Sequence, residues 1–167
     1  YETRSEAVKM TSIRVEDTSA RNLKLDPPEG MSKDDKRRWA YQRYITDYTR
    51  TIQAIDDSVG TLLAYLDENG LAENTLVIYT SDQGMFLGDH GWHDKRFMYE
   101  QSLQMPFLAR LPGEIDAGSV SDAMLLNIDF APTFYDYAGI DCPDEVQGTS
   151  GRQILAGTTP DGWRTSM

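Results

Sequence analysis

Residues 76–100 have the sequence LVIYTSDQGMFLGDHGWHDKRFMYE, and this stretch decides the fold of the chain. It begins with an apolar, β-branched run at residues 76–79, which predicts a buried strand. The run breaks at Thr80-Ser81-Asp82-Gln83-Gly84 into a polar loop that contains both histidines of the chain, His90 and His93. In α/β proteins, ligands bind at the carboxyl ends of the strands. We therefore expect this loop to determine the function.

A long helix is predicted before this strand, over residues 33–69. Ser32 has the residue type of a helix N-cap, and acidic residues follow it in the first turn, where they complement the helix dipole. Asn69-Gly70 is a typical C-terminal stop. Apolar side chains recur at three- and four-residue spacings, the strongest periodic signal in the chain: Trp39, Ile45, Tyr48, Ile52, Ile55, Val59, Leu62, Leu63 and Leu66.

The other predicted elements are shorter. They are a helical turn at residues 97–103, a strand at 106–110, a strand or extended segment at 120–126, a helix at 129–138 and a short helix at 151–155. Asp129 lies near the expected N-cap of the fourth of these, and Gly139 is its expected stop. The order helix, strand, loop, strand, helix indicates a three-layer α/β fold, preceded by a loop or extended segment at residues 1–30.

Composition excludes several classes of function. The formal net charge of -11 argues against nucleic-acid binding and against binding to anionic membrane surfaces, and it favours a cation site. A mean hydropathy of -0.52 and the lack of a long apolar run exclude a transmembrane helix. The single cysteine, Cys142, excludes an internal disulfide and a cysteine-cluster metal site. The chain begins at Tyr1 and keeps its pattern to Met167, so we expect a piece of a longer protein.

Asp82 and Gln83 are the predicted metal ligands. A carboxylate and an amide carbonyl are hard oxygen donors, which suit Ca²⁺ or Mg²⁺ better than zinc. Gly84 would let the backbone turn closely past an ion or ligand. Two ligands do not fill a shell of about six to eight oxygens, so the others must come from elsewhere. Asp56 and Asp57 are adjacent on the predicted helix and point about 100° apart, so they converge poorly on one ion.

Basic residues later in the loop indicate a site for an anion. The ammonium of Lys95 can neutralise charge on a transferring group, and Arg96 offers a planar fork for oxyanions or sugar hydroxyls. His90 can act as an acid, as a hydrogen-bond donor or as a structural part of the loop, and His93 is a weaker case of the same kind. Each side chain alone is commonly just solvated in a loop. Together, beside a strand end, they favour an anion site.

The chain resembles the type I sulfatases. The resemblance covers about residues 41–155, in order, and is carried by these segments: Asp56-Asp57-Ser58-Val59-Gly60, Leu66–Leu71, Asn74–Gly84, Leu87-Gly88-Asp89-His90-Gly91, Asp94-Lys95-Arg96, Tyr99-Glu100, Pro106, Arg110-Leu111-Pro112-Gly113, Asn127–Thr133, Ala138-Gly139-Ile140 and Gln147-Gly148-Thr149-Ser150. It implies an alkaline-phosphatase-like fold, of which residues 31–167 would form part, and hydrolysis of sulfate esters. The Asp-Lys-Arg-Phe-Met-Tyr-Glu form looks most like N-acetylglucosamine-6-sulfatases and mucin- or glycosaminoglycan-desulfating enzymes.

The resemblance also implies roles for residues in the loop. Asp82 matches an aspartate that binds Ca²⁺ in the family, and Gln83 stands where a further metal ligand is found. Lys95 matches the lysine that contacts the sulfate, with His90 as a supporting catalytic residue. Asp94 and Arg96 occupy positions that resemble sugar-hydroxyl contacts. The implied partner is a sulfated small molecule or glycan, and the implied location of the parent is periplasmic or secreted.

The nucleophile of the family is missing from this chain. In the family it is a formylglycine made from the first residue of a Cys-x-Pro-x-Arg motif, whereas Cys142 is followed directly by Pro143. The chain would therefore supply part of the calcium site and the sulfate clamp but no covalent catalysis, and alone it would be inactive. Two alternatives stay open: a phosphate-ester or phosphodiester hydrolase of the same superfamily, and a noncatalytic metal- or carbohydrate-binding fragment.

Overall fold

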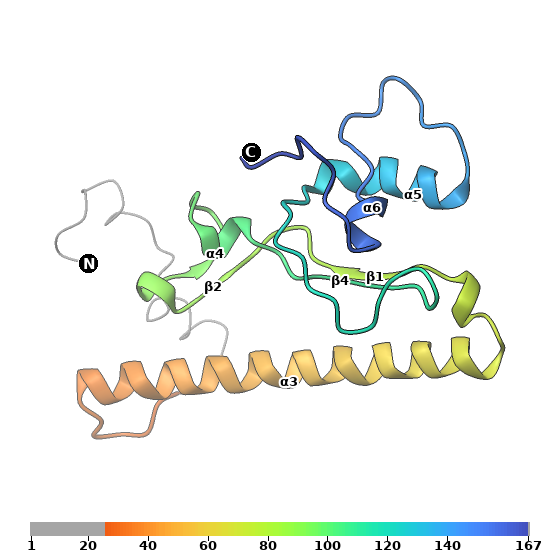
Figure 1. Cartoon of the computed structure of the whole chain (residues 1–167). Coiled ribbons are helices and arrows are strands. Elements are labelled where there is room, and N and C mark those ends of the chain that lie inside the picture. The colour runs from red at the N-terminus through yellow and green to blue at the C-terminus, as the bar shows by residue number, and fades with distance from the viewer. Residues whose placement is uncertain (1–25, 167) are drawn as a thin grey trace. The chain divides into compact units, whose positions relative to one another are not determined.

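The computed structural model describes residues 26–166 (Figure 1). Of the predicted loop at residues 1–30, only residues 26–30 lie within this range, and they form an irregular stretch with a turn. The described chain divides into two compact units. The first contains the residues up to Ala64 together with Gln83–Pro106, and the second contains Tyr65–Asp82 and the residues from Phe107 onward. No helix within residues 26–166 is both long and apolar enough to cross a membrane.

The predicted long helix is confirmed as α3 (Lys33–Glu68). Ser32 caps its start, because the Ser32 hydroxyl accepts a hydrogen bond from the Asp35 N–H at 3.2 Å and donates one to the Asp35 carboxylate at 2.6 Å. At its end Gly70 has φ 64°. The N–H groups of Gly70 and Leu71 then bond the carbonyls of Asp67 and Leu66, at 3.3 and 2.9 Å, as in a Schellman motif. Local capping chemistry therefore fixes both ends of the helix.

The first unit is built on a small hairpin that the sequence analysis did not predict. Strand β2 (Phe86–Leu87) pairs with β3 (His93–Asp94) in antiparallel register, and η2 (Asp89–Gly91) connects them. The Phe86 and Trp92 side chains form its fully buried core, with ring centroids 5.4 Å apart and planes nearly perpendicular. The polar loop therefore contains an ordered hairpin held by aromatic packing.

Gly88 brings α3 against this hairpin within the first unit. It has φ 112°, and a Cβ at this position would lie 2.6 Å from Cε2 of Tyr41 on α3. Any larger residue would therefore be strained in its backbone and would collide with the tyrosine ring. The helix α4 (Glu100–Leu103) follows the hairpin and confirms the later part of the turn predicted at residues 97–103. The buried Ser102 hydroxyl donates to the carbonyls of Phe97 and Tyr99.

The second unit contains two of the predicted strands, but the first of them, predicted to be buried, is only partly buried in the structure and exposes Tyr79. After η1 (Ala72–Asn74), strand β1 (Val77–Thr80) pairs antiparallel with β4 (Phe107–Arg110), with Tyr79 opposite Leu108. Because this pair is antiparallel, the carboxyl end of β1 lies beside the amino end of β4. The rule that ligands gather at neighbouring carboxyl ends in parallel sheets therefore does not apply to this pair.

Helix α5 (Phe130–Ala138) confirms the predicted helix at residues 129–138. Gly139 ends it in the left-handed conformation, with φ 65°. The Phe130 ring lies 5.5 Å from that of Phe107 on β4, so the helix packs against the sheet of its own unit. η3 (Asn127–Asp129) precedes α5, and α6 (Arg152–Leu155) is the short helix predicted at residues 151–155. Residues 120–126 form no strand.

Candidate functional site

Asp82 and Gln83 follow β1 after one residue, Ser81, where the sequence places a metal site. The Asp82 side chain is exposed, and its Oδ1 lies 3.4 Å from the Ser81 hydroxyl. Within residues 26–166, no group of three or more His, Cys, Asp or Glu side chains is arranged to hold a metal ion. The donor chemistry of Asp82 and Gln83 fits a hard cation, but only as part of its shell, because calcium takes about six to eight oxygens.

Gly84 packs against the backbone around α4, a contact that was not predicted, and its predicted place beside an ion or ligand stays a prediction. A Cβ at this position would lie 2.3 Å from the Gln101 carbonyl oxygen and 2.5 Å from that of Gln104. The Gly84 N–H also donates to the carbonyl of Ser102 at 3.0 Å. The close approach that requires glycine is therefore to the backbone around α4. This packing fixes the path of the chain directly after the predicted metal ligands.

Asp94, Lys95 and Arg96 form a tight turn at the end of β3. Asp94 has φ 79°, in the left-handed region, where aspartate is tolerated because its side chain bonds locally. Its Oδ1 accepts the Lys95 N–H at 2.8 Å, and its Oδ2 pairs with Arg96 Nε at 3.0 Å. Lys95 and Arg96 are exposed. The structure therefore brings together the predicted sulfate-contacting lysine and its two predicted neighbours.

His90 belongs to the aromatic cluster of the first unit. Its ring centroid lies 5.1 Å from that of Tyr99, 5.7 Å from that of Trp92 and 6.2 Å from that of Phe86. The residue has φ 59° at the tip of the hairpin. These contacts give His90 a structural role in the loop, and its predicted catalytic role stays a prediction. His93 lies in β3, opposite Leu87.

Tyr44 of α3 is a residue of this region that the sequence analysis missed. Its hydroxyl is buried and has no hydrogen-bond partner within residues 26–166. Burial raises the pKa of this phenol above its usual value, and the charges of Tyr48, Asp94 and Tyr41 raise it further. Asp94 is thus close enough to Tyr44 to act on it electrostatically. Tyr44 is not one of the periodic apolar positions of the predicted helix, and no motif in the sequence marks it.

Asp129 is a buried carboxylate of the second unit, and its function is structural. It was predicted near the N-cap of α5, but its side chain does not cap that helix. Instead Oδ2 accepts the Leu126 N–H at 2.8 Å and Oδ1 accepts the Thr149 N–H at 2.9 Å. Arg164 forms an ion pair with the same carboxylate. The two sequence segments around Asp129 and Thr149 are thereby joined.

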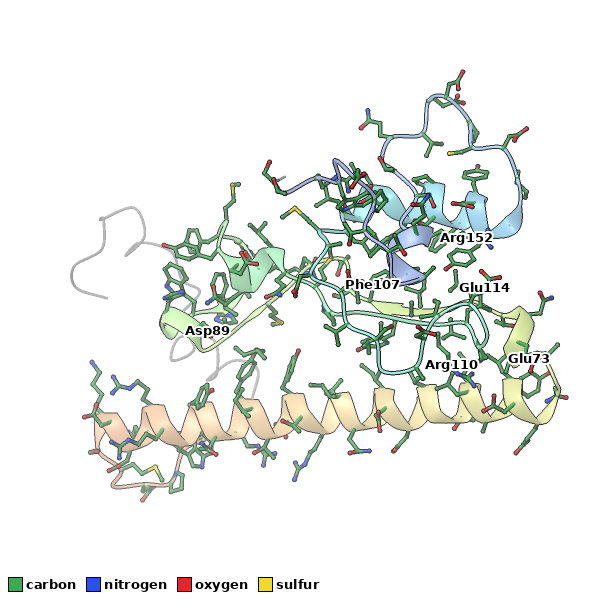
Figure 2. All side chains as sticks on the ribbon, in the orientation of Figure 1. Glu73, Asp89, Phe107, Arg110, Glu114 and Arg152 are labelled. Carbon is green, nitrogen blue, oxygen red and sulfur yellow. The ribbon has the colours of Figure 1, made fainter. Side chains whose placement is uncertain are left out.

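Other polar contacts of the second unit are more exposed. Arg152 bonds Glu114 at 2.9 Å and Asp136 at 3.2 Å, and its guanidinium lies 4.6 Å from the centre of the Tyr137 ring (Figure 2). In the first unit, Asp89, which is labelled in Figure 2, accepts the Leu87 N–H at 3.1 Å. Each of these contacts satisfies groups within its own unit. None of them adds a side chain to the predicted metal or anion site.

Comparison with known proteins identifies the family. Residues 88–167 match the family model of the N-sulphoglucosamine sulphohydrolase C-terminal region. Over 128 residues, the chain is 52% identical to N-acetylglucosamine-6-O-sulfatase of Bacteroides thetaiotaomicron. The aligned residues cover 75% of this chain and 23% of that protein. The chain belongs to the sulfatase family. The predicted resemblance is thus confirmed, including the likeness to N-acetylglucosamine-6-sulfatases.

Solved structures support the alkaline-phosphatase-like sulfatase fold. One is the structure of a protein in complex with its substrate D-glucosamine-2-N,6-O-disulfate. This structure matches the chain with a TM-score of 0.85 and 38% identity, over 98% of this sulfatase chain and 42% of the other chain. Another is the phosphonate monoester hydrolase of Silicibacter pomeroyi, with a TM-score of 0.72, 30% identity and coverage of 84% and 26%. Residues 28–122 also match the model of type I phosphodiesterases and nucleotide pyrophosphatases.

The sulfatase chain spans only part of its relatives. The match to the Bacteroides thetaiotaomicron enzyme covers 23% of that enzyme. The match to an arylsulfatase of Clostridium perfringens has 36% identity and covers 25% of that protein. The chain therefore corresponds to about a quarter of the length of these curated relatives.

Proposed function

We propose that the full-length protein hydrolyses sulfate esters of carbohydrates, of the glycosaminoglycan or mucin type, and that this chain supplies part of its anion site. The observation that carries the proposal is the similarity to a glucosamine disulfate complex, at 38% identity over 98% of the chain. The identity of 52% to an N-acetylglucosamine-6-O-sulfatase supports the same substrate class.

Lys95 is the proposed sulfate contact. It is exposed, and its backbone is fixed through the Asp94 carboxylate at 2.8 Å. Its ammonium can therefore approach a sulfate oxygen and stabilise the charge that develops on the transferring group. Arg96 next to it presents a planar guanidinium that can bond sugar hydroxyls or a second sulfate oxygen. His90 stays a proposed supporting residue at the tip of the hairpin.

Asp82 and Gln83 are the proposed calcium ligands from this chain. The ion, when bound, would polarise the sulfate oxygens. The two side chains contribute hard oxygen donors shortly after β1 and leave most of the shell to other residues. A formylglycine nucleophile would also have to come from outside these 167 residues, since no Cys-x-Pro-x-Arg motif is present. The isolated chain should then bind anions without turning over a sulfate ester.

The turn of Asp94, Lys95 and Arg96 contributes only part of the positive charge of the proposed site, since a bound calcium ion would add its own. One carboxylate, Asp94, and two cations, Lys95 and Arg96, leave a single net positive charge. A sulfate monoester is a monoanion, whereas a phosphate monoester carries about −1.5 to −2 at neutral pH. A phosphonate monoester or a phosphodiester is also a monoanion. The similarity to a phosphonate monoester hydrolase therefore keeps phosphorus monoanions as the second candidate substrate class.

Three aryl esters with the same leaving group separate these possibilities. We expect the full-length protein to have its highest kcat/KM on the aryl sulfate, and to act as well on glucosamine 6-sulfate. A higher kcat/KM on the aryl phosphonate or aryl phosphate would contradict the proposal. Lys95→Ala should lower kcat/KM on the sulfate at least about a hundredfold, the usual effect of removing one charge-stabilising donor. Unchanged kinetics would remove Lys95 from the site.

A noncatalytic role predicts a different result. A carbohydrate- or metal-binding fragment would bind sulfated glucosamine in calorimetry, but the full-length protein would release no sulfate. The reading frame of the parent offers an independent check. A Cys-x-Pro-x-Arg or Ser-x-Pro-x-Arg motif upstream of this chain supports sulfatase catalysis, and a complete parent without either motif would exclude it.

A further inference from the structure

Asp94 is bonded on both carboxylate oxygens to the two residues that follow it. Oδ1 accepts the Lys95 N–H at 2.8 Å, and Oδ2 pairs with Arg96 Nε at 3.0 Å. The Asp94 side chain is 23% exposed, whereas that of Arg96 is 75% exposed. The carboxylate thus lies at the base of the turn, and the guanidinium extends from it into solvent. Bonding through Nε leaves the two terminal nitrogens of Arg96 available for a ligand.

The base of this turn is fixed to the core of the first unit. Asp94 is part of β3 and lies opposite Phe86, whose side chain is fully buried. Its φ of 79° lies in the left-handed region, which residues other than glycine rarely adopt, so the local bonds must hold it there. The chain after Asp94 therefore leaves the hairpin in a defined direction.

The charge of Asp94 also acts on Tyr44 of α3. Tyr44 places a buried hydroxyl close enough to Asp94 for the carboxylate charge to contribute to the raised pKa of the phenol, after burial and Tyr48. The two bonds of Asp94 to its own turn limit the freedom of its carboxylate. This constraint passes to Lys95 and Arg96 through the two bonds above.

We propose that Asp94 is a positioning residue of the anion site: it holds the Lys95 backbone and the Arg96 guanidinium in one turn, so that both cations meet the same sulfate ester. The inference rests on the proposed sulfatase function and deepens it. It differs from a direct contact between Asp94 and a sugar hydroxyl, because a positioning residue acts on every sulfate ester, with or without a sugar.

The test compares two substrates of the full-length protein, glucosamine 6-sulfate and an aryl sulfate that has no sugar hydroxyls. In Asp94→Asn the amide oxygen can still accept the Lys95 N–H, and asparagine tolerates a left-handed φ, but the charge that holds Arg96 is lost. We expect kcat/KM to fall about tenfold or more on both substrates, by similar factors, since misplaced groups lower rates to this extent. A loss confined to glucosamine 6-sulfate would overturn the proposal in favour of direct sugar contact.

A double-mutant comparison adds a readout that a merely structural role would not change. In the Arg96→Ala variant, the additional change Asp94→Asn should lower kcat/KM much less than the same change does in the wild type. The reason is that the guanidinium that Asp94 holds is already absent. Fully additive effects would contradict the proposal. Arg96→Lys keeps the charge but loses Nε, and because its side chain is exposed the fold should persist. It should lower kcat/KM on both substrates even if Asp94→Asn fails to fold, and an unchanged kcat/KM on the aryl sulfate would contradict the proposal.

Asp47→Asn is the matched control. Asp47 forms surface pairs on α3 with Arg43 at 3.3 Å and with Arg50 at 3.2 Å, and neither pair involves the turn, so its loss should leave kcat/KM unchanged on both substrates. The outcomes also distinguish the inference from the function on which it rests. If the wild type hydrolyses neither ester, the proposed function fails. If the wild type is active and loses activity in Lys95→Ala but not in Asp94→Asn, only the positioning role fails.

Discussion

The carboxylate of Asp129 forms an ion pair with the guanidinium of Arg164, and the Asp129 side chain is fully buried. The Arg164 guanidinium also lies 4.8 Å from the centre of the Trp163 ring, whose indole N–H donates to the Met124 carbonyl at 2.8 Å. A buried charge is tolerated only when it is paired and hydrogen-bonded. This contact therefore fastens the end of the described chain to the base of α5.

Removing this carboxylate should strongly destabilise the second unit. Asp129→Ala leaves Arg164 and two backbone N–H groups without their acceptor, and breaking a buried pair in this way costs about 3–5 kcal/mol. Urea unfolding of the protein measures the change. Asp67→Ala is the control, because it removes an exposed pair with Arg110 of 2.8 Å and should cost at most about 1 kcal/mol. An equal loss of unfolding free energy in the two variants would contradict the expected effect of the buried pair.

Protonation of Asp129 at low pH should lower the free energy of unfolding of the protein. Burial alone would raise the pKa of Asp129, but the bonds from Arg164, Leu126 and Thr149 outweigh it, and its pKa lies below the ordinary value of 3.8. A group with a lowered folded-state pKa stabilises the protein above its unfolded pKa, and this stabilisation is lost as the pH falls through the folded value.

The free energy of unfolding should therefore fall below about pH 5, more steeply in the wild type than in Asp129→Asn. Asparagine cannot bind that proton, so its contribution to the slope vanishes. Urea titrations at a series of pH values test this. Parallel pH profiles for the two proteins would rule out Asp129 as a source of the acid sensitivity.

Gly148 should be among the glycines most sensitive to substitution. It has φ 98°, and a Cβ there would lie 2.3 Å from the Ile128 carbonyl oxygen. Gly148→Ala should destabilise the protein by more than the roughly 1–2 kcal/mol of the left-handed conformation alone. Gly118→Ala isolates that conformational part, because Gly118 has φ 73° and no atom within 4 Å of its Cβ position. Equal losses of thermal stability in both variants would contradict the close approach to Ile128.

Calcium binding should depend on Asp82. In the full-length protein, Asp82→Asn removes one charged oxygen ligand and should weaken calcium affinity at least about tenfold, the effect that even outer-shell changes give. Calorimetric titration of the metal-free protein measures the affinity directly. Asp89→Asn is the control, because this carboxylate accepts the Leu87 N–H within its own loop. An affinity unchanged by Asp82→Asn would exclude Asp82 as a ligand.

Elements with local signals were predictable from the sequence. The bounds of α3 follow from Ser32 and Gly70, and the end of α5 follows from Gly139. Caps and helical periodicity depend on neighbours a few positions away, so they can be recognised without tertiary contacts. The loop with Lys95 and its neighbours was likewise visible as a cluster of residue types.

Features that depend on distant partners were not predictable. The strands of the hairpin, β2 and β3, contain too few residues to show alternation, and their pairing depends on the Phe86–Trp92 core. Asp129 had the pattern of a helix cap, yet it bonds Thr149, which lies 20 positions away. Gly84 likewise serves a contact with Gln101 that no local motif reveals.

The link between Asp129 and Thr149 has a consequence for how this unit can vary in length. Residues 140–147 leave α5 after Gly139 and return at Gly148, which packs against the Ile128 carbonyl. One end of the segment is therefore fixed at the end of α5, and the other is fixed beside Ile128, just before α5 begins. Nearly all residues between these two ends are exposed. Longer loops add little entropy cost when their ends are already fixed. Insertions between Ile140 and Val146 should therefore be tolerated where single substitutions at Gly148 are not.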